Sequence, residues 1–188
     1  IPSRLSATRL PGKPLLKING LSIISHVYKR AEKANIGEVI VAAEDKEIVE
    51  DVKTNGGNAI LTSKKNKTGT DRIYEAFKIL DRNDIELIMN IQGDEPEIDI
   101  NDIKKLNNNM INNKNAKIGT LAAKISDIKM YENQNVVKVK TKESFEQNPF
   151  PIVDNFFRNI EKNKNIFHHI GIYCYEVETL KNFVSFNQ

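Results

Sequence analysis

The chain has 188 residues, of which 39% are hydrophobic and 28% are charged, and its formal net charge at pH 7 is +3. This length and composition are typical of a globular domain with a sizeable core. The mild charge argues against a nucleic-acid-binding protein, and no apolar run approaches the roughly 20 residues that a membrane-spanning helix needs. A single cysteine, Cys174, excludes an internal disulfide and is typical of a reducing compartment.

The chain opens on a loop, residues 1–15, that is basic and shaped by proline and glycine. Pro11 and Pro14 lack backbone donors and Gly12 loosens the backbone, so this segment is not predicted to be a helix. Its cations are Arg4, Arg9 and Lys13. Basic side chains on a shaped loop suit a polyphosphate ligand, and a solvated surface loop is the open alternative. The Walker A pattern is absent from the sequence, which argues against an NTPase of that type.

Helix-like and strand-like patterns alternate through the rest of the first half. Apolar residues spaced three and four apart predict helices, and short continuous apolar runs predict buried strands of a parallel sheet. Helices are expected over residues 21–34, 46–53 and 71–80, and strands over residues 39–43, 59–61 and 87–91. The run Lys64-Lys65-Asn66-Lys67 is interpreted as solvated surface.

The second half continues the alternation. A helix is expected over residues 99–110, strands over 118–123, 136–139 and 167–175, and a terminal helix over 177–186. Residues 144–154 contain two prolines and are expected to be irregular, and the polar residues 155–165 are expected to be helical or loose. The whole pattern predicts an α/β fold with an open, mostly parallel sheet and helices on both faces. Because the chain begins without Met, we expect it to be part of a longer protein.

Polar residues follow the predicted strand 87–91, where ligands of open α/β sheets bind. A carboxylate such as Asp94 at the end of a strand can hold Mg²⁺, which takes oxygen ligands and bridges phosphates. Together with the basic loop, Asp94 would make a phosphate-and-metal site of the kind that nucleotidyl transfer requires. The alternative is that Gly93-Asp94-Glu95-Pro96 is a simple turn.

Two further features have both a functional and a structural interpretation, and for a third, Cys174, only the structural one is favoured. Thr68-Gly69-Thr70 opens the helix 71–80 and is either an anion-binding loop or a simple helix cap. His168 and His169 are adjacent on a strand and face opposite ways, so they cannot easily share a metal, and a structural role is the alternative. Cys174 lies in an apolar strand without activating neighbours and is predicted to be a core residue.

Five motifs follow one another in a fixed order along the chain. They are Pro2-x-Arg4 with Thr8-Arg9-Leu10-Pro11-Gly12-Lys13-Pro14-Leu15, Thr68-Gly69-Thr70-Asp71-Arg72, Asn90-Ile91-Gln92-Gly93-Asp94-Glu95-Pro96, Asn135-Val136-Val137-Lys138-Val139, and His169-Ile170-Gly171-Ile172-Tyr173-x-Tyr175. In this order they resemble the 3-deoxy-D-manno-octulosonate cytidylyltransferase (CMP-Kdo synthetase) family of sugar-acid cytidylyltransferases. The resemblance covers essentially the whole chain.

The resemblance implies a reaction in which CTP and the sugar acid Kdo give CMP-Kdo and pyrophosphate, with Mg²⁺. By analogy, Arg4 and Lys13 neutralise the triphosphate, and Asp94 holds the metal. The nucleotide-binding residues would be Thr8, Arg9, Thr68, Gly69 and Thr70, and the residues facing the sugar acid would be Arg72, Gln92, His169 and Tyr173, with Arg72 pairing with its carboxylate. The family further implies a homodimer acting in the cytoplasm, in lipopolysaccharide synthesis.

The resemblance also implies limits and alternatives. One nucleotidyltransferase domain over residues 1–188 is expected, truncated at both ends, with a sub-region at 144–175 contributing to the sugar site and the dimer contact. The family's first strand would lie mostly before Ile1, and a second metal-binding Asp beyond Gln188. Ala7 and Glu44 stand where the family has Ser and Asp, and Glu146-Gln147 stands where it has Ser-Arg. A related sugar acid, such as 8-amino Kdo or a sialic-acid-like substrate, and a non-catalytic nucleotide-binding module therefore stay open.

Overall fold

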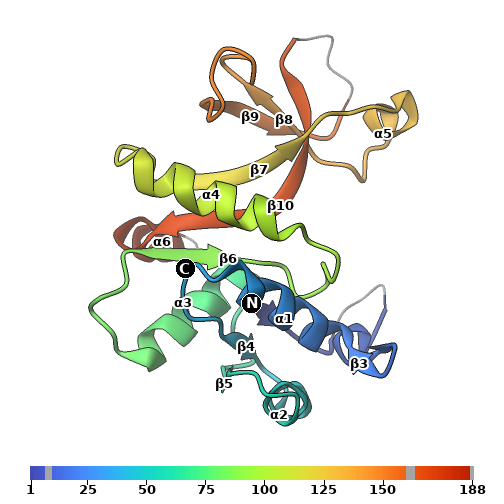
Figure 1. Cartoon of the computed structure of the whole chain (residues 1–188), viewed down its shortest axis with the longest axis vertical. Coiled ribbons are helices and arrows are strands. Elements are labelled where there is room, and N and C mark those ends of the chain that lie inside the picture. The colour runs from blue at the N-terminus through green and yellow to red at the C-terminus, as the bar shows by residue number, and fades with distance from the viewer. Residues whose placement is uncertain (7–9, 160–163, 187–188) are drawn as a thin grey trace. The chain divides into compact units, whose positions relative to one another are not determined.

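The computed structural model describes residues 1–6, 10–159 and 164–186. The chain divides into two compact units, one of residues 1–119 and 172–188 and the other of residues 120–171 (Figure 1). The second unit contains most of the sub-region expected at 144–175, but it begins earlier, at Thr120. No helix in the described part of the chain is long and apolar enough to cross a membrane.

A parallel sheet forms the base of the first unit. Its strands are β1 (Pro2–Ser3), β4 (Val41–Ala43) and β5 (Ala59–Leu61), in the order β1-β4-β5. Both pairs are parallel, with Pro2 opposite Ala42 and Ala42 opposite Ile60. The three residues of β4 are at most 2% exposed, as expected for the middle strand of a buried sheet. The α/β class that the alternation predicted is confirmed.

Four helices of the first unit lie close to where the apolar spacing placed them. They are α1 (Ile23–Ala34), α2 (Lys46–Thr54), α3 (Gly69–Leu80) and α4 (Ile100–Asn112). Helix α1 packs against α2 and α4, and α3 packs against β1 and β4. The Ser22 side chain caps α1 by accepting a hydrogen bond from Ser25 N, so this helix begins two residues later than expected.

The end of the chain returns to the first unit and completes its core. Strand β6 (Leu87–Asn90) pairs antiparallel with the last residues of β10 (Ile166–Glu176), and α6 (Val177–Ser185) packs against α3. Ile73, Tyr175, Leu180 and Val184 form a buried apolar cluster there. Since β6 is held in this way, the turn that follows it has a fixed starting point.

The second unit contains β8 (Lys138–Thr141), which pairs antiparallel with β9 (Val153–Phe157) and with the first residues of β10. The expectation that residues 153–157 would be irregular, helical or loose is therefore wrong. The fully buried Lys138 joins this unit internally, because its Nζ donates to Asn133 O at 2.7 Å and to Arg158 O at 2.9 Å. Strand β7 (Ile118–Ala123) agrees with its expected bounds, and the short helix α5 (Ile128–Glu132) was not expected.

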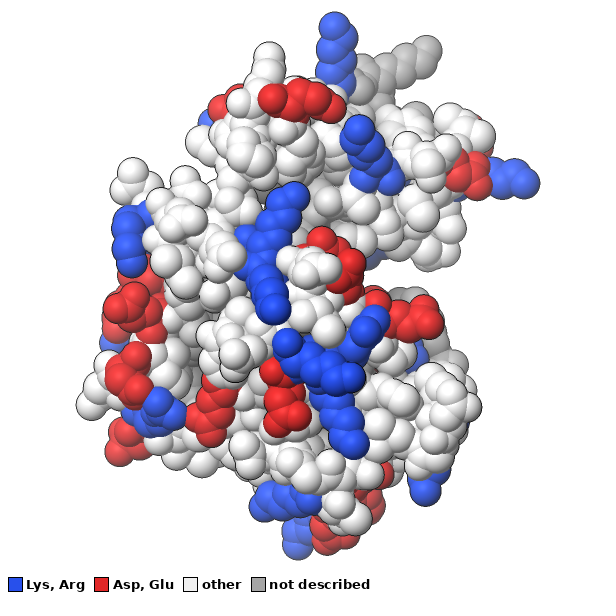
Figure 2. Space-filling view, viewed as in Figure 1, with Lys and Arg blue, Asp and Glu red and all other residues white. Residues whose placement is uncertain are grey.

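Short elements join the opening loop to α1. A 3₁₀ turn, η1 (Lys13–Leu15), is followed by the small hairpin of β2 (Lys17–Ile18) and β3 (Leu21–Ser22). The hairpin turns at Asn19 and Gly20, which both have positive φ angles, of 50° and 84°. On the face shown in Figure 2, cationic and anionic side chains are interspersed.

Candidate functional site

A pocket of about 330 Å³ in the first unit brings together three segments that lie far apart in the sequence. It is lined by residues 2–4, 13–14, 66–69, Arg72 and 92–94. These segments are the opening loop, the start of α3 with the residues before it, and the turn after β6. The structure therefore places Arg4, Lys13, Thr68, Gly69, Arg72, Gln92 and Asp94, all expected from the sequence, around one cavity.

A backbone hydrogen bond within the opening loop joins its first and last parts. Gly12 N donates to Leu5 O at 3.0 Å, and Gly12 has a φ of 72°, a conformation that favours glycine. Pro14 is buried behind it, and Lys13 Nζ lies 2.8 Å from Asp94 Oδ2. The prediction of a shaped basic loop is confirmed for these residues. Thr8 and Arg9 lie outside the described residues.

Two carboxylates after β4 anchor this loop. Asp45 Oδ2 accepts a hydrogen bond from Leu5 N at 2.7 Å, and Glu44 Oε1 accepts one from Ser6 Oγ at 3.2 Å. Because β4 is the middle strand of the parallel sheet, these contacts tie the loop to the most buried part of the fold.

Arg72 borders the pocket but is 2% exposed, and its guanidinium is already engaged. It forms an ion pair with Glu44 and donates to Thr62 Oγ1 at 2.7 Å. Glu44 therefore contacts both Arg72 of α3 and Ser6 of the opening loop. Sequence reasoning expected Arg72 to pair with a substrate carboxylate and did not foresee this internal partner.

The turn after β6 needs glycine at position 93. A Cβ added to Gly93 would lie 2.8 Å from Pro2 O, closer than real Cβ atoms come to backbone oxygen. Glu95 N donates to Gln92 O at 3.3 Å, so this segment is both a turn and a wall of the pocket. Asp94 stands at its tip with its side chain 53% exposed.

The donor set around Asp94 fits a cation that brings its own oxygen ligands. Among the residues that the structure describes, no group of three or more His, Cys, Asp or Glu side chains gathers to hold a metal. A Mg²⁺ ion, however, usually keeps several waters and binds through one or two carboxylates together with substrate phosphates. Asp94 beside the cations Arg4 and Lys13 agrees with that mode of binding.

The start of α3 is fixed by a capping box. Thr68 Oγ1 accepts from Asp71 N at 3.1 Å, while Asp71 Oδ2 accepts from Thr68 N at 2.8 Å. The helix-cap interpretation of this motif is thus confirmed, and Thr68 and Gly69 also line the pocket. Thr70 does not line it, and its side chain hydrogen-bonds that of Tyr175.

Asn66 and Lys67 line the same pocket, which sequence reasoning missed when it interpreted residues 64–67 as solvated surface. Lys64 and Lys65 are exposed and do not line it. The signal that could have found Lys67 is its place directly before the cap of α3, since that helix start faces the pocket.

His169 and Tyr173 do not line this pocket. His169 belongs to the second unit, where its Nε2 lies 3.0 Å from Thr120 Oγ1 and its ring packs edge-on against Phe156. Burial, and then the charge of His168, lower its pKa to about 4. Tyr173 belongs to the first unit, stacks on Tyr175 and packs against the apolar cluster, and burial raises its pKa.

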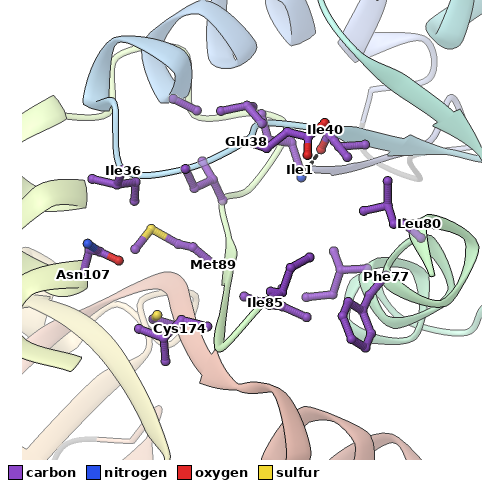
Figure 3. Close-up of a pocket in the computed structure, with 18 of the residues that line it drawn as sticks. Ile1, Ile36, Glu38, Ile40, Phe77, Leu80, Ile85, Met89, Asn107 and Cys174 are labelled. Carbon is purple, nitrogen blue, oxygen red and sulfur yellow. Dashed lines mark hydrogen bonds between the residues drawn. The ribbon is translucent and has the colours of Figure 1, made fainter. Parts of the chain in front are cut away.

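A larger cavity of about 430 Å³ in the first unit has a different character. Figure 3 shows mainly apolar side chains around it, among them Ile1, Met89 and Cys174. Arg82, its cation, is paired with Glu38 and Asp84. Cys174 is fully buried, which confirms it as a core residue, and burial raises the pKa of its thiol to about 12. The smaller pocket is lined mainly by charged and polar residues, which suit a phosphate ligand, so we take it as the candidate site.

Comparisons with known proteins identify the family of this chain. A family model described as Cytidylyltransferase matches residues 1–188. The chain is 41% identical over 196 residues to a 3-deoxy-manno-octulosonate cytidylyltransferase of Thermodesulfovibrio yellowstonii, covering 98% of this chain and 76% of that protein. It is 42% identical over 182 residues to the protein of the same name from Fusobacterium nucleatum, covering 94% of this chain and 71% of that protein.

A solved structure gives the corresponding comparison in three dimensions. The structure of CMP:2-keto-3-deoxy-manno-octonic acid synthetase complexed with CTP is similar to this chain with a TM-score of 0.86 and 31% sequence identity. The match covers 98% of this chain and 75% of that one.

Proposed function

Because this chain belongs to the 3-deoxy-manno-octulosonate cytidylyltransferase family, we propose that it transfers the cytidylyl group of CTP to 3-deoxy-manno-octulosonate (Kdo) and releases pyrophosphate. It is a nucleotidyltransferase of the α/β class. The observation that carries the proposal is the pocket in which Arg4, Lys13 and Asp94 converge. Nucleotidyl transfer needs positioning and charge neutralisation, and this pocket offers both.

In the proposed reaction, the anomeric hydroxyl of the sugar acid attacks the α-phosphorus of CTP. A bond forms between the sugar oxygen and phosphorus, the bond from phosphorus to the bridging oxygen breaks, and pyrophosphate leaves with that electron pair. The hydroxyl proton passes to water. Arg4 and Lys13 neutralise the charge that builds on the leaving pyrophosphate. No covalent nucleophile is needed, in keeping with the inert Cys174.

Asp94 is the residue that we propose to hold Mg²⁺ on the phosphate oxygens. When bound, the ion neutralises phosphate charge and orients the triphosphate. Lys13 and Asp94 neutralise each other in this structure, so a cation on Asp94 would leave the Lys13 ammonium available to a phosphate. Thr68 and Gly69, which line the pocket, would contact the nucleotide, and Gln92, which also lines it, would contact the sugar acid.

The identity of the sugar acid has a second candidate. Gln147 stands where the family has a cation, and its Oε1 accepts from Ser144 N at 3.3 Å, inside its own turn. A modified sugar acid that does not need this cation, such as 8-amino Kdo, is the second candidate. His169 and Tyr173 belong to the proposed sugar contacts by family resemblance.

A pyrophosphate-release assay on the full-length gene product tests the function. CTP with Kdo and Mg²⁺ should release pyrophosphate, with UTP and ATP as nucleotide controls and EDTA as the metal control. Kdo, 8-amino Kdo and N-acetylneuraminate, offered in competition, identify the sugar acid. Tight binding of CTP without release of pyrophosphate for any sugar acid would instead identify a nucleotide-binding module.

The proposal includes a homodimer and a cytoplasmic location, where CTP is made, and a product that feeds lipopolysaccharide synthesis. Light scattering on the purified protein tests the dimer, and cell fractionation tests the location. A monomer with full activity would remove dimerisation from the proposal without affecting the chemistry.

A further inference from the structure

We propose that Lys67 is an additional anion-binding residue of the pocket and contacts either a phosphate of the nucleotide or the carboxylate of the sugar acid. This inference rests on the proposed function and adds to it a residue that is absent from the motifs of the family resemblance. The starting observation is that Lys67 lines the pocket, whereas Lys64 and Lys65 of the same run do not.

The charge balance of the pocket supports this role. Among the described residues that line it, four are cations, Arg4, Lys13, Lys67 and Arg72, and one, Asp94, is acidic. Arg72 is paired with Glu44 and Lys13 with Asp94. Within residues 1–6, 10–159 and 164–186, Arg4 and Lys67 have no acidic partner within ion-pair distance. Of these four cations, Arg4 and Lys67 therefore offer a ligand a charge that no acidic side chain of the described residues neutralises.

The segment that carries Lys67 is held in place from both sides. Glu75 of α3 accepts hydrogen bonds from Ser63 N at 2.9 Å and 3.1 Å, and it also accepts one from Asn66 Nδ2. On the other side, the capping box fixes Thr68. Because the neighbours of Lys67 are held on both sides, its backbone needs little further ordering when the side chain binds an anion, which lowers the entropic cost of the contact.

Asn66 itself is not the binding group, although it lines the pocket. Its amide donates to Ser63 O at 2.9 Å and to Glu75, so its donors serve the loop. The chemistry that this loop offers a ligand is therefore the ammonium group of Lys67, which suits both phosphate and carboxylate oxygens.

The test compares Lys67→Gln with Lys65→Gln, a matched control three residues before Thr68 that does not line the pocket. Both are exposed, so both variants should fold, and thermal melting checks this. In the pyrophosphate-release assay, Lys67→Gln should raise one KM by roughly tenfold at low salt, and less at high salt, where the charge is screened. Lys65→Gln should stay within about twofold, and Lys67→Arg should restore most of the loss.

The arms of the experiment distinguish the two anions. A rise confined to the KM for CTP identifies a phosphate, and a rise confined to the KM for Kdo identifies the carboxylate. Equal kinetics for Lys67→Gln and Lys65→Gln would overturn the inference. If the wild-type protein released no pyrophosphate, the proposed function would fail, and separate titrations of CTP and of Kdo into wild-type protein and Lys67→Gln would still test the cation. Equal affinities of the two proteins for both ligands would then overturn the inference.

Discussion

Lys13 Nζ lies 2.8 Å from Asp94 Oδ2, although the two residues are 81 positions apart in the sequence. This contact joins the opening loop to the turn after β6, and so joins the two strongest motifs of the chain. Both side chains are partly exposed, at 34% and 53%, which means that the pair adds little to stability. Its value is to keep a cation and the carboxylate that we propose to hold Mg²⁺ in one small volume.

Asp94→Asn should lower turnover by about two to three orders of magnitude while the fold survives. The amide keeps the shape of the side chain but loses the charge that we propose to hold Mg²⁺. Steady-state pyrophosphate release across a range of Mg²⁺ concentrations measures the effect, and thermal melting should match the wild type. Near-normal turnover would remove Asp94 as the metal ligand.

Lys13→Ala should weaken CTP binding or turnover by about tenfold or more, because a charge-assisted contact to phosphate is lost. Calorimetric titration of CTP separates binding from chemistry. Lys17→Ala, which removes an exposed lysine of the nearby hairpin, is the control. Unchanged kinetics in Lys13→Ala would mean that the opening loop is solvated surface after all.

Much of this site could be predicted because its motifs lie at the ends of helices and strands. The spacing of apolar residues and the helix-cap residues in the sequence show where these helices and strands begin and end. The strand over residues 59–61 has the predicted bounds, and α3 begins two residues early only because Thr68 caps it. Helix caps and buried runs are local properties, so they can be recognised in one segment alone.

What the sequence did not reveal depends on contacts between distant segments. Strand β9 has an exposed, polar middle and exists through its pairing with β8, so its own residues show no strand pattern. The engagement of Arg72 by Glu44 joins α3 to the end of β4 across 28 positions. Sequence reasoning interpreted Lys67 as part of a charged run. Its local signal, the place directly before the cap of α3, indicates a pocket only once the fold brings the opening loop and the turn after β6 to that helix start.

Gly93→Ala should destabilise the protein by about 1–3 kcal/mol, since the new Cβ would lie 2.8 Å from Pro2 O and force β1 or the turn to shift. Chemical denaturation measures the loss, and a raised KM for CTP should accompany it. Gly37→Ala is the matched control, because its Cβ would meet nothing within 4 Å. Equal stability of the two variants would contradict the close approach of Pro2 and Gly93.

Glu44→Gln should cost about 3–5 kcal/mol of stability, because the buried Arg72 would keep its charge without a carboxylate. Ser6 also loses its charged acceptor, so turnover should fall too. Glu44→Asp keeps the charge and should lose less stability and less turnover than Glu44→Gln.

The control is Glu38→Gln, which breaks an exposed pair with Arg82 and should change the free energy of unfolding by less than about 1 kcal/mol. A Glu44→Gln variant as stable as Glu38→Gln would show that the buried pair is unimportant.

The stability of the protein should fall as the pH is lowered from about 6.5 towards 4, in part through His169. Burial lowers the pKa of His169 to about 4 from its ordinary 6.5, so in this range the unfolded chain takes up a proton that the folded chain does not. The neutral ring is accommodated beside Thr120 and Phe156 in the folded state, and its contribution to stability is fully present above pH 6.5.

His169→Gln should therefore lose less stability than the wild type between pH 7 and pH 4.5, as followed by thermal melting. If His169→Gln and the wild type lose equal stability over this range, His169 is not the group that titrates.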